Sequence, residues 1–227
     1  MKLTRLLLGA LLVTAAQSAS AAIIVVRANG PSAAQYPVGR SLPDNASVRL
    51  RGGDTLVLLD AKGSRTLKGP GIFPAAASGG GGSVSSFNAL MASANGRRGR
   101  VGAVRPAPQP RQLWQASSDR SEAFCFINPA GVLIRRENIA EPRTVVVTDL
   151  ASGKSAPVHF SAAQQVVEWP SSVPLVGGNR YRIGSAEASM KQIAPGSSFA
   201  DLGSALIRHG CMSQVDALST TTSYAAY

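Results

Sequence analysis

Residues 53–60 read GDTLVLLD, and residues 61–68 continue with AKGSRTLK. An apolar run that begins after Gly-Asp and ends at Asp is typical of a buried strand. Gly63 can adopt the positive φ that a tight hairpin turn requires, so the stretch predicts two antiparallel strands joined at 60–63. Further strands are expected at 23–27 and 47–51, which together give a small antiparallel β meander or barrel over residues 22–73.

The second half of the chain also has the pattern of short strands. Asn128-Pro129, Ser152-Gly153 and similar turn residues separate the candidate strands. Those strands are 112–116, 121–128, 132–136, 143–149, 155–160, 165–169, 180–184 and 189–193. Seven or eight short strands in this spacing resemble an immunoglobulin-like β sandwich over residues 112–195. Trp169 and Tyr181 are expected at its core or corners, and the chain as a whole is expected to be mainly β.

Two segments depart from the strand pattern. Residues 74–111 are rich in Ala, Ser, Gly, Pro and Arg, and cannot bury enough apolar surface to offset their ordering entropy. We expect a flexible basic linker there, with at most one or two helical turns around Phe87. At the other end, Ser198 and Asp201 resemble a capping box, and the sequence predicts a helical tail over 196–218 packed on the sandwich. Residues 219–227 are expected to fray.

The first residues predict export. Lys2 and Arg5 precede an apolar run at 6–16, and Ala19-Ser20-Ala21 has the small residues of a signal-peptidase site. The run is shorter than the roughly 20 residues that a membrane-spanning helix needs. We therefore expect a signal peptide over 1–21, cleavage near Ala21, no transmembrane anchor afterwards and a periplasmic location.

Residues 53–60 and 63–71 also resemble the periplasmic FecR-type β domain of envelope regulators. In those domains a glycine-aspartate turn precedes an apolar strand, a tight hairpin and a strand that ends in glycine. The resemblance, extended over residues 23–73, implies a non-catalytic periplasmic module used in signalling or scaffolding. It supplies no catalytic residues.

The charge is unevenly distributed. The formal net charge is +11, and no acidic residue lies between Asp60 and Asp119. A patch of like charge attracts polyanions. In an exported protein these would be envelope lipids or anionic polysaccharides rather than nucleic acid. The expected anion-binding residues are Arg97, Arg98, Arg100, Arg105 and Arg111, although a merely solvated linker is an alternative.

The sequence contains no known catalytic or metal-binding motif. There is no G-x-S-x-G elbow, no zinc-ligand spacing and no phosphate-binding glycine motif. His159 and His209 are expected to be structural, and no cofactor or metal is expected. The carboxylates at turns or caps are Asp54, Asp60, Asp149, Glu168 and Asp201; whether any of them pair in space stays open.

Cys125 and Cys211 are the two cysteines of the chain. In an oxidising compartment such a pair predicts a disulfide, here one that ties the helical tail to the sandwich. The sequence thus favours a non-catalytic periplasmic envelope module that binds another envelope protein or an anionic glycan or lipid surface. Two alternatives stay open: an accessory component of a periplasmic signalling system, and an envelope hydrolase whose carboxylates converge only in the fold.

Overall fold

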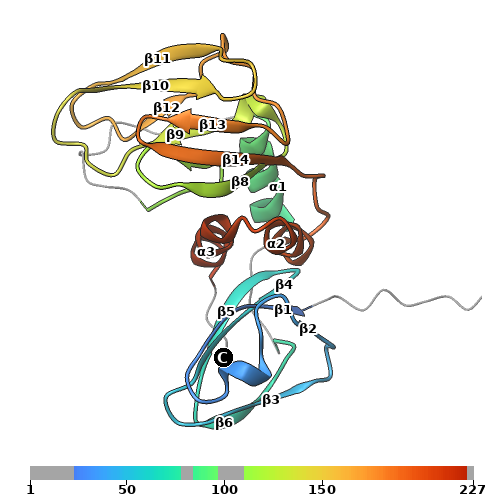
Figure 1. The fold of residues 1–227 in the computed structure, drawn as a ribbon. Helices are drawn as coiled ribbons and strands as arrows, with labels where there is room; N and C mark the ends of the chain where they lie inside the picture. The colour runs from blue at the N-terminus through green and yellow to red at the C-terminus, as the bar shows by residue number, and fades with distance from the viewer. Residues whose placement is uncertain (1–22, 78–83, 97–109, 224–227) are drawn as a thin grey trace, which may run out of the picture.

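The structure is a computed structural model that describes residues 23–77, 84–96 and 110–223 (Figure 1). It is mainly β with terminal helices, which confirms the predicted fold class. The predicted signal peptide lies outside the described residues. We refer to residues 23–77 as the N-terminal module and to residues 110–193 as the sandwich.

The N-terminal module contains a four-stranded sheet and a separate strand pair. The sheet order is β2-β1-β4-β5, and β3 pairs with β6. Because β1 pairs with β4, the order differs from the predicted meander, and the sheets do not close into a barrel. The bounds are β1 Ile23–Asn29, β2 Ser41–Leu42, β3 Ser47–Leu50, β4 Thr55–Asp60, β5 Gly63–Lys68 and β6 Gly71–Pro74, with a 3-10 turn at Ala33–Gln35.

The predicted hairpin between β4 and β5 is confirmed. Asp60 pairs with Gly63, whose φ is 137°, and the Asp60 carboxylate accepts a hydrogen bond from the Lys62 N–H at 2.7 Å. The apolar run of β4 is buried on both faces. Leu56 and Leu58 enter the module's own core, whereas Val57 and Leu59 face a second core beyond the sheet.

The sandwich consists of two sheets. The five-stranded sheet has the order β11-β10-β13-β14-β8, and the three-stranded sheet has the order β12-β9-β7. Two pairs, β14 with β8 and β7 with β9, are parallel. The bounds are β7 Gln115–Ser117, β8 Glu122–Phe126, β9 Leu133–Arg135, β10 Arg143–Asp149, β11 Ser155–Phe160, β12 Val166–Glu168, β13 Arg180–Ile183 and β14 Ala186–Gln192. Phe124, Ile134 and Val147 are among the fully buried residues between the sheets.

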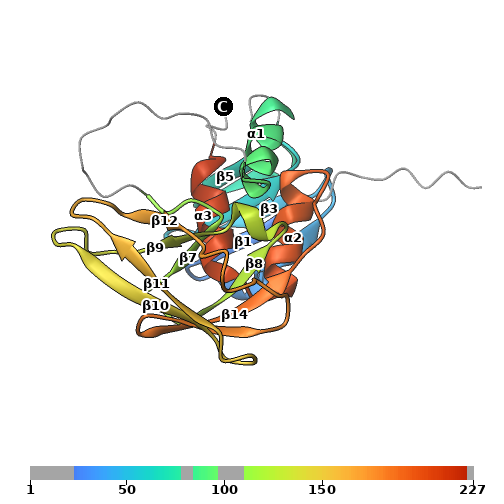
Figure 2. The same cartoon turned by 90° about the horizontal axis from the view of Figure 1, so that it is seen from above.

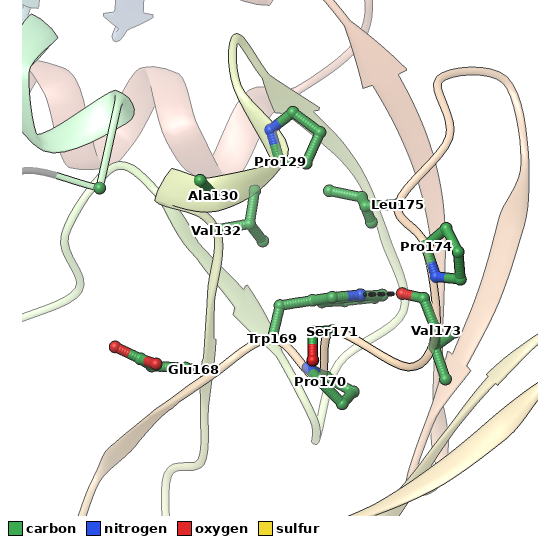
Figure 3. Close-up of a pocket in the computed structure, with 11 residues that line it drawn as sticks. Pro129, Ala130, Val132, Glu168, Trp169, Pro170, Ser171, Val173, Pro174 and Leu175 are labelled. Carbon is green, nitrogen blue, oxygen red and sulfur yellow. Dashed lines mark hydrogen bonds between the residues drawn. The ribbon is translucent and has the colours of Figure 1, made fainter.

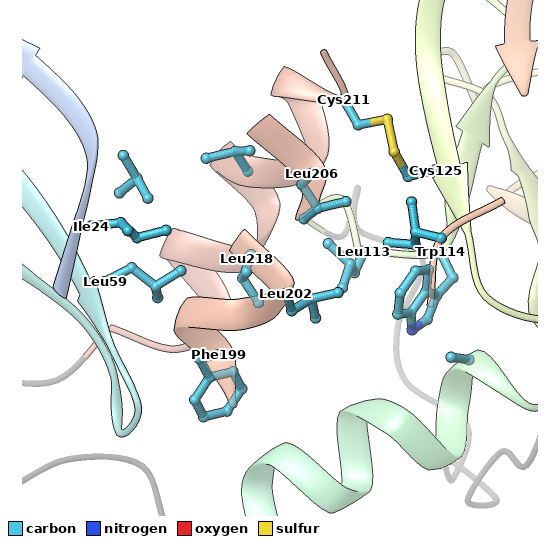
Figure 4. Packing of buried hydrophobic residues seen from close by; sticks show 14 of the residues in the cluster. Ile24, Leu59, Leu113, Trp114, Cys125, Phe199, Leu202, Leu206, Cys211 and Leu218 are labelled. Atoms are coloured by element: carbon cyan, nitrogen blue, oxygen red, sulfur yellow. A yellow bond between two sulfur atoms is a disulfide. The ribbon is translucent and has the colours of Figure 1, made fainter. Parts of the chain in front are cut away.

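Two helices fill the space between the N-terminal module and the sandwich (Figure 1). They are α2, Phe199–Arg208, and α3, Met212–Thr221. Leu202 and Leu206 of α2 share one core with Leu59 on one side and Trp114 on the other (Figure 4). The contact of α2 with the N-terminal module is close, since a Cβ atom at Gly203 would lie 2.4 Å from Leu59 Cδ2.

The prediction that the helical tail packs on the sandwich was therefore incomplete. The tail packs on both parts of the chain, because the second apolar face of β1 and β4 also needs a cover. This core includes Cys125 and Cys211, which are both fully buried. They form a disulfide with their Cα atoms 5.9 Å apart, as expected from the sequence.

Helix α3 also satisfies the edges of two sheets. Near its start, the buried Gln214 side chain accepts from the Cys125 N–H at 2.6 Å and donates to the carbonyls of Cys125 and Leu113 at 2.8 and 2.9 Å. At its other end the Thr222 carbonyl accepts from the Ser64 N–H at 3.0 Å, on the edge strand β5. Residues 219–223 are consequently ordered, and the expectation of fraying was wrong for them; residues 224–227 lie outside the described residues.

The segment predicted as a linker contains a full helix. Helix α1, Val84–Ala94, lies against the sandwich and α2, and Figure 2 shows the three helices gathered on one side of the two sheets. The Phe87 ring packs edge-on against Phe199 at 5.1 Å, and the Leu90 carbonyl accepts from the indole N–H of Trp114 at 3.3 Å. The prediction of a flexible linker over 74–111 was thus wrong for residues 84–94. Helix α1 packs against apolar residues that are distant in the sequence, which a local pattern cannot show.

We predict that Gln214→Leu destabilises the whole chain. The substitution roughly keeps the side-chain volume but leaves the buried Cys125 N–H and two carbonyls without partners, at a cost of about 3 kcal/mol or more. Urea denaturation measures the loss. Met212→Ala, on the exposed side of the same helix, is the matched control and should change stability little. An equally small effect of Gln214→Leu would contradict the edge-satisfying role.

The disulfide should contribute strongly to stability. Cys125 and Cys211 are 86 residues apart, and closing a loop of this length is worth about 4–5 kcal/mol in the chain-entropy model. The double variant Cys125→Ala/Cys211→Ala should lose this amount, and reductant should produce a similar loss only in the parent chain. Reductant sensitivity that persists in the double variant would contradict the assignment.

Candidate functional site

A groove of about 360 Å³ opens on the sandwich beside Trp169 (Figure 3). One wall is formed by the 3-10 turn Pro129–Gly131. The other parts are the end of β12, the loop that follows it, and Gly96, which lies just after α1. We call it the Trp169 groove. Its lining residues are Gly96, Pro129, Ala130, Val132, Glu168, Trp169, Pro170, Ser171, Val173, Pro174 and Leu175.

Hydrogen bonds hold Trp169 in a fixed orientation. Its indole N–H donates to the Val173 carbonyl at 2.7 Å, and its ring meets Tyr181 edge-on with the centroids 5.2 Å apart. The Tyr181 hydroxyl in turn donates to the Pro174 carbonyl at 2.7 Å and accepts from the Val176 N–H at 2.9 Å. Burial raises the pKa of Tyr181, so this hydroxyl keeps its proton and its role as a donor. The loop is thus built around the tryptophan.

The opposite wall is equally well fixed. The Asn128 side chain accepts from the Ala130 N–H at 3.0 Å, and the Val132 N–H donates to the Pro129 carbonyl at 3.1 Å. Gly131 allows α1 to approach, since a Cβ atom there would lie 2.0 Å from the Ala94 carbonyl oxygen. In this way α1 supports the turn that faces the indole across the groove.

The chemistry of the groove is that of a binding surface. Glu168 is the only titratable residue among the described lining residues, and Ser171 provides the one hydroxyl. Acid-base catalysis between two carboxylates needs a second acid, and an activated serine needs a neighbouring base. The described lining supplies neither. An aromatic face among prolines is suited to holding an apolar ligand.

A second depression, of about 490 Å³, brings Ser197, Asp201 and His209 to one side of α2. Ser197 donates its hydroxyl to the Asp201 carboxylate, and the Ser198 hydroxyl accepts from the Asp201 N–H at 3.2 Å. Hydrogen bonds from Ser197 and Ser198 hold the pKa of Asp201 below its ordinary value, despite partial burial. A carboxylate with a lowered pKa is a poor general base. Ser197 and Asp201 instead belong to the N-terminal cap of α2, whereas His209 lies at the C-cap of the same helix.

The other carboxylates singled out in the sequence also bind backbone groups. Asp54 accepts from the Ser32 N–H at 2.9 Å and from Arg51, and Asp149 accepts from the Ala151 N–H at 3.0 Å and from Ser152. Burial alone would raise the pKa of Asp54, but its hydrogen bonds outweigh that effect and lower it. The pKa of Asp149 is lowered mainly by the Ser152 hydroxyl. These carboxylates stabilise turns.

Most of the predicted anion-binding residues lie outside the described residues: Arg97, Arg98, Arg100 and Arg105. Arg111 is described, and its guanidinium is bound within the protein. It donates to Glu122 Oε2 at 2.9 Å and to the Gln115 carbonyl at 2.6 Å, and its side chain is only 11% exposed. Its expected place in a free anion-contacting surface is therefore wrong, since Glu122 already neutralises it.

The two histidines lie apart from the groove. His159 Nδ1 is 2.8 Å from the Thr144 hydroxyl on the outer face of the five-stranded sheet, and His209 caps the C-terminus of α2. Within residues 23–77, 84–96 and 110–223, no group of three or more His, Cys, Asp or Glu residues is placed to hold a metal ion.

The sequence does not predict the groove, because it places Trp169 at the core or a corner of the sandwich. Pro170 and Pro174, which flank a short loop after a strand, were the available signal, but their partners Pro129 and Ala130 are distant in the sequence. The chain matches no protein-family model, no curated protein and no solved structure. In the part of the chain that the structure describes, no helix is long and apolar enough to cross a membrane.

The lowered carboxylate pKa values predict acid sensitivity. A group whose pKa is below its ordinary 3.8 in the folded state stabilises the fold above that pH and loses the contribution as the pH falls. Stability should therefore be level near neutrality and fall between about pH 4 and pH 2. Urea titrations at several pH values measure this, and Asp54→Asn should lessen the fall while Asp44→Asn, at an exposed site, should not. A pH profile that Asp54→Asn leaves unchanged would contradict the assignment.

Proposed function

We propose that this chain is a non-catalytic module of the cell envelope that binds another envelope protein through the Trp169 groove. The observation that carries the proposal is the construction of the groove, in which a rigid indole and three prolines line a cavity of about 360 Å³. Pre-formed apolar cavities with a few polar groups are the usual sites of ligand recognition.

The setting in the envelope rests on the sequence and on the disulfide. Residues 1–21 have the pattern of a signal peptide, and the chain carries a buried disulfide of the kind that persists in oxidising compartments. The resemblance of residues 23–73 to FecR-type domains supports a role as an accessory component of a periplasmic signalling system. In that role the groove would supply the contact with the partner.

Enzymatic activity receives less support. A hydrolase would need a nucleophile or a pair of carboxylates next to its cavity. The described lining of the groove has one carboxylate, and the depression beside α2 uses its aspartate as a cap.

Binding of an anionic glycan or lipid surface is the second candidate. It is supported by the arginines at 97, 98, 100 and 105, which lie in a stretch without acidic residues. This binding would be independent of the groove, and it would weaken steeply with salt because exposed charges are screened over about 8 Å at physiological ionic strength. Sedimentation with anionic vesicles, before and after replacement of these four arginines by serine, distinguishes it from binding in the groove.

A photo-crosslinking amino acid at Ser171 tests the proposed function in the native cell. Ser171 is exposed and lines the groove, so a partner seated there should give one specific adduct. Ala130→Arg, which fills the groove from the opposite wall without removing core atoms, should abolish the adduct.

The same crosslinker at Val146 is the matched control. Val146 is 48% exposed, on the outer face of the five-stranded sheet and away from the groove. Identical adducts from both positions, or an adduct at Ser171 that survives Ala130→Arg, would refute the groove as the binding site.

A further inference from the structure

The Trp169 groove offers flat apolar faces and few groups that could satisfy a polar ligand. The indole N–H is occupied by the Val173 carbonyl, and the carbonyls of Pro174 and Pro129 accept from Tyr181 and Val132. The three prolines have no N–H to donate. Apart from the Trp169 N–H, Glu168 and Ser171 are the polar side chains of the described lining, so most hydroxyls of a buried sugar would lose water without finding a new partner, which is unfavourable. The groove therefore selects against a glycan.

The charge of the groove also disfavours a glycan that is anionic. Its described lining contains no lysine or arginine, and the one charged residue, Glu168, is acidic. The described lining thus offers an anionic ligand no basic side chain as a counter-ion. The groove is therefore complementary to a neutral segment of a protein. It is not suited to bind the anionic polymers that the arginines at 97, 98, 100 and 105 could attract.

The shape of the groove further restricts the kind of ligand that it can bind. Figure 3 shows the indole ring edge-on, with Ala130 and Val132 on one side of its plane and Pro170 and Ser171 on the other. One indole face is thereby turned to the cavity, across from the 3-10 turn. A polyproline II segment has no internal hydrogen bonds, keeps its carbonyl groups in water and is already stiff, so it loses little entropy when it packs its rings on aromatic faces.

We propose that the Trp169 groove binds a neutral, extended, proline-containing segment of the partner protein in the polyproline II conformation. This inference rests on the proposed function and names the chemical class of its ligand. Trp169 is then the main contact surface, and Ala130 and Pro174 determine which side chains fit beside it.

The test uses the two tryptophans as separate reporters. The full-length mature chain, labelled with 15N, has two indole N–H resonances, those of Trp169 in the groove and Trp114 in the shared core. The probe is a synthetic peptide that repeats the sequence Pro-Ala-Pro-Gln-Pro twice. Its control is the same peptide with every proline replaced by alanine.

The proline peptide should shift the Trp169 resonance saturably and leave that of Trp114 unchanged. The alanine peptide should bind at least about tenfold more weakly. Ala130→Arg should weaken binding of the proline peptide by at least about tenfold, whereas Val146→Ser should have no effect. Because both substituted residues lie at the surface, an unchanged spectrum elsewhere confirms that the variants fold.

Each other outcome overturns the inference in a distinct way. Equal binding of the two peptides, or no shift of Trp169, refutes the proline class. The proposed function would still stand in that case if the crosslink at Ser171 remains sensitive to Ala130→Arg. A further outcome is that the peptide shifts the Trp169 resonance only after the chain's own prolines at 106, 108 and 110 are replaced by alanine. That result would show that this segment of the chain occupies the groove, and it would refute a partner protein as the occupant.

Discussion

The side-chain amide of Gln214 takes the place of a neighbouring strand at the edge of β8. It satisfies the N–H and the carbonyl of Cys125 and the carbonyl of Leu113, all within a buried core. A sheet edge buried without such partners would carry unsatisfied groups, each costly to desolvate. The disulfide from the same strand to Cys211 fixes α3 at this position. The apolar core between the N-terminal module and the sandwich depends on this attachment.

The groove depends on that core through α1. Phe199 of α2 contacts Phe87, Trp114 donates to the Leu90 carbonyl, and the C-terminal end of α1 lies against Gly131, which stands between the groove residues Ala130 and Val132 in the chain. The binding surface proposed for Trp169 is therefore supported by the same helices that join the two parts of the chain. The turn in the groove wall packs on α1, α1 packs on α2, and α2 packs on β4, so packed side chains connect the groove to the N-terminal module.

Local patterns in the sequence predicted some of these features and could not predict others. The β4–β5 hairpin follows from Asp60 and Gly63 alone, and the α2 cap follows from Ser198, because both depend on neighbours along the chain. The order of strands in the N-terminal module, the partners of α1 and the burial of α2 on both sides depend on contacts between distant residues. Trp169 shows the limit for the site: the local strand pattern predicts a core or corner residue, and its position opposite Ala130, which the pattern cannot show, makes it the wall of a groove. Likewise, the pairing of Arg111 with Glu122 could not be deduced from the charge pattern.

The central claim is that α2 and α3 join the N-terminal module and the sandwich into one cooperative unit. Native-state hydrogen exchange measures it most directly, through the amides of Leu58 in β4 and Ile134 in β9, which are buried in the two separate cores. If the claim is correct, both amides exchange only through global unfolding and share one free energy of opening, with the same dependence on denaturant. Exchange of Leu58 at a clearly lower free energy than Ile134, with a smaller denaturant dependence, would show that the N-terminal module unfolds on its own and would contradict the account.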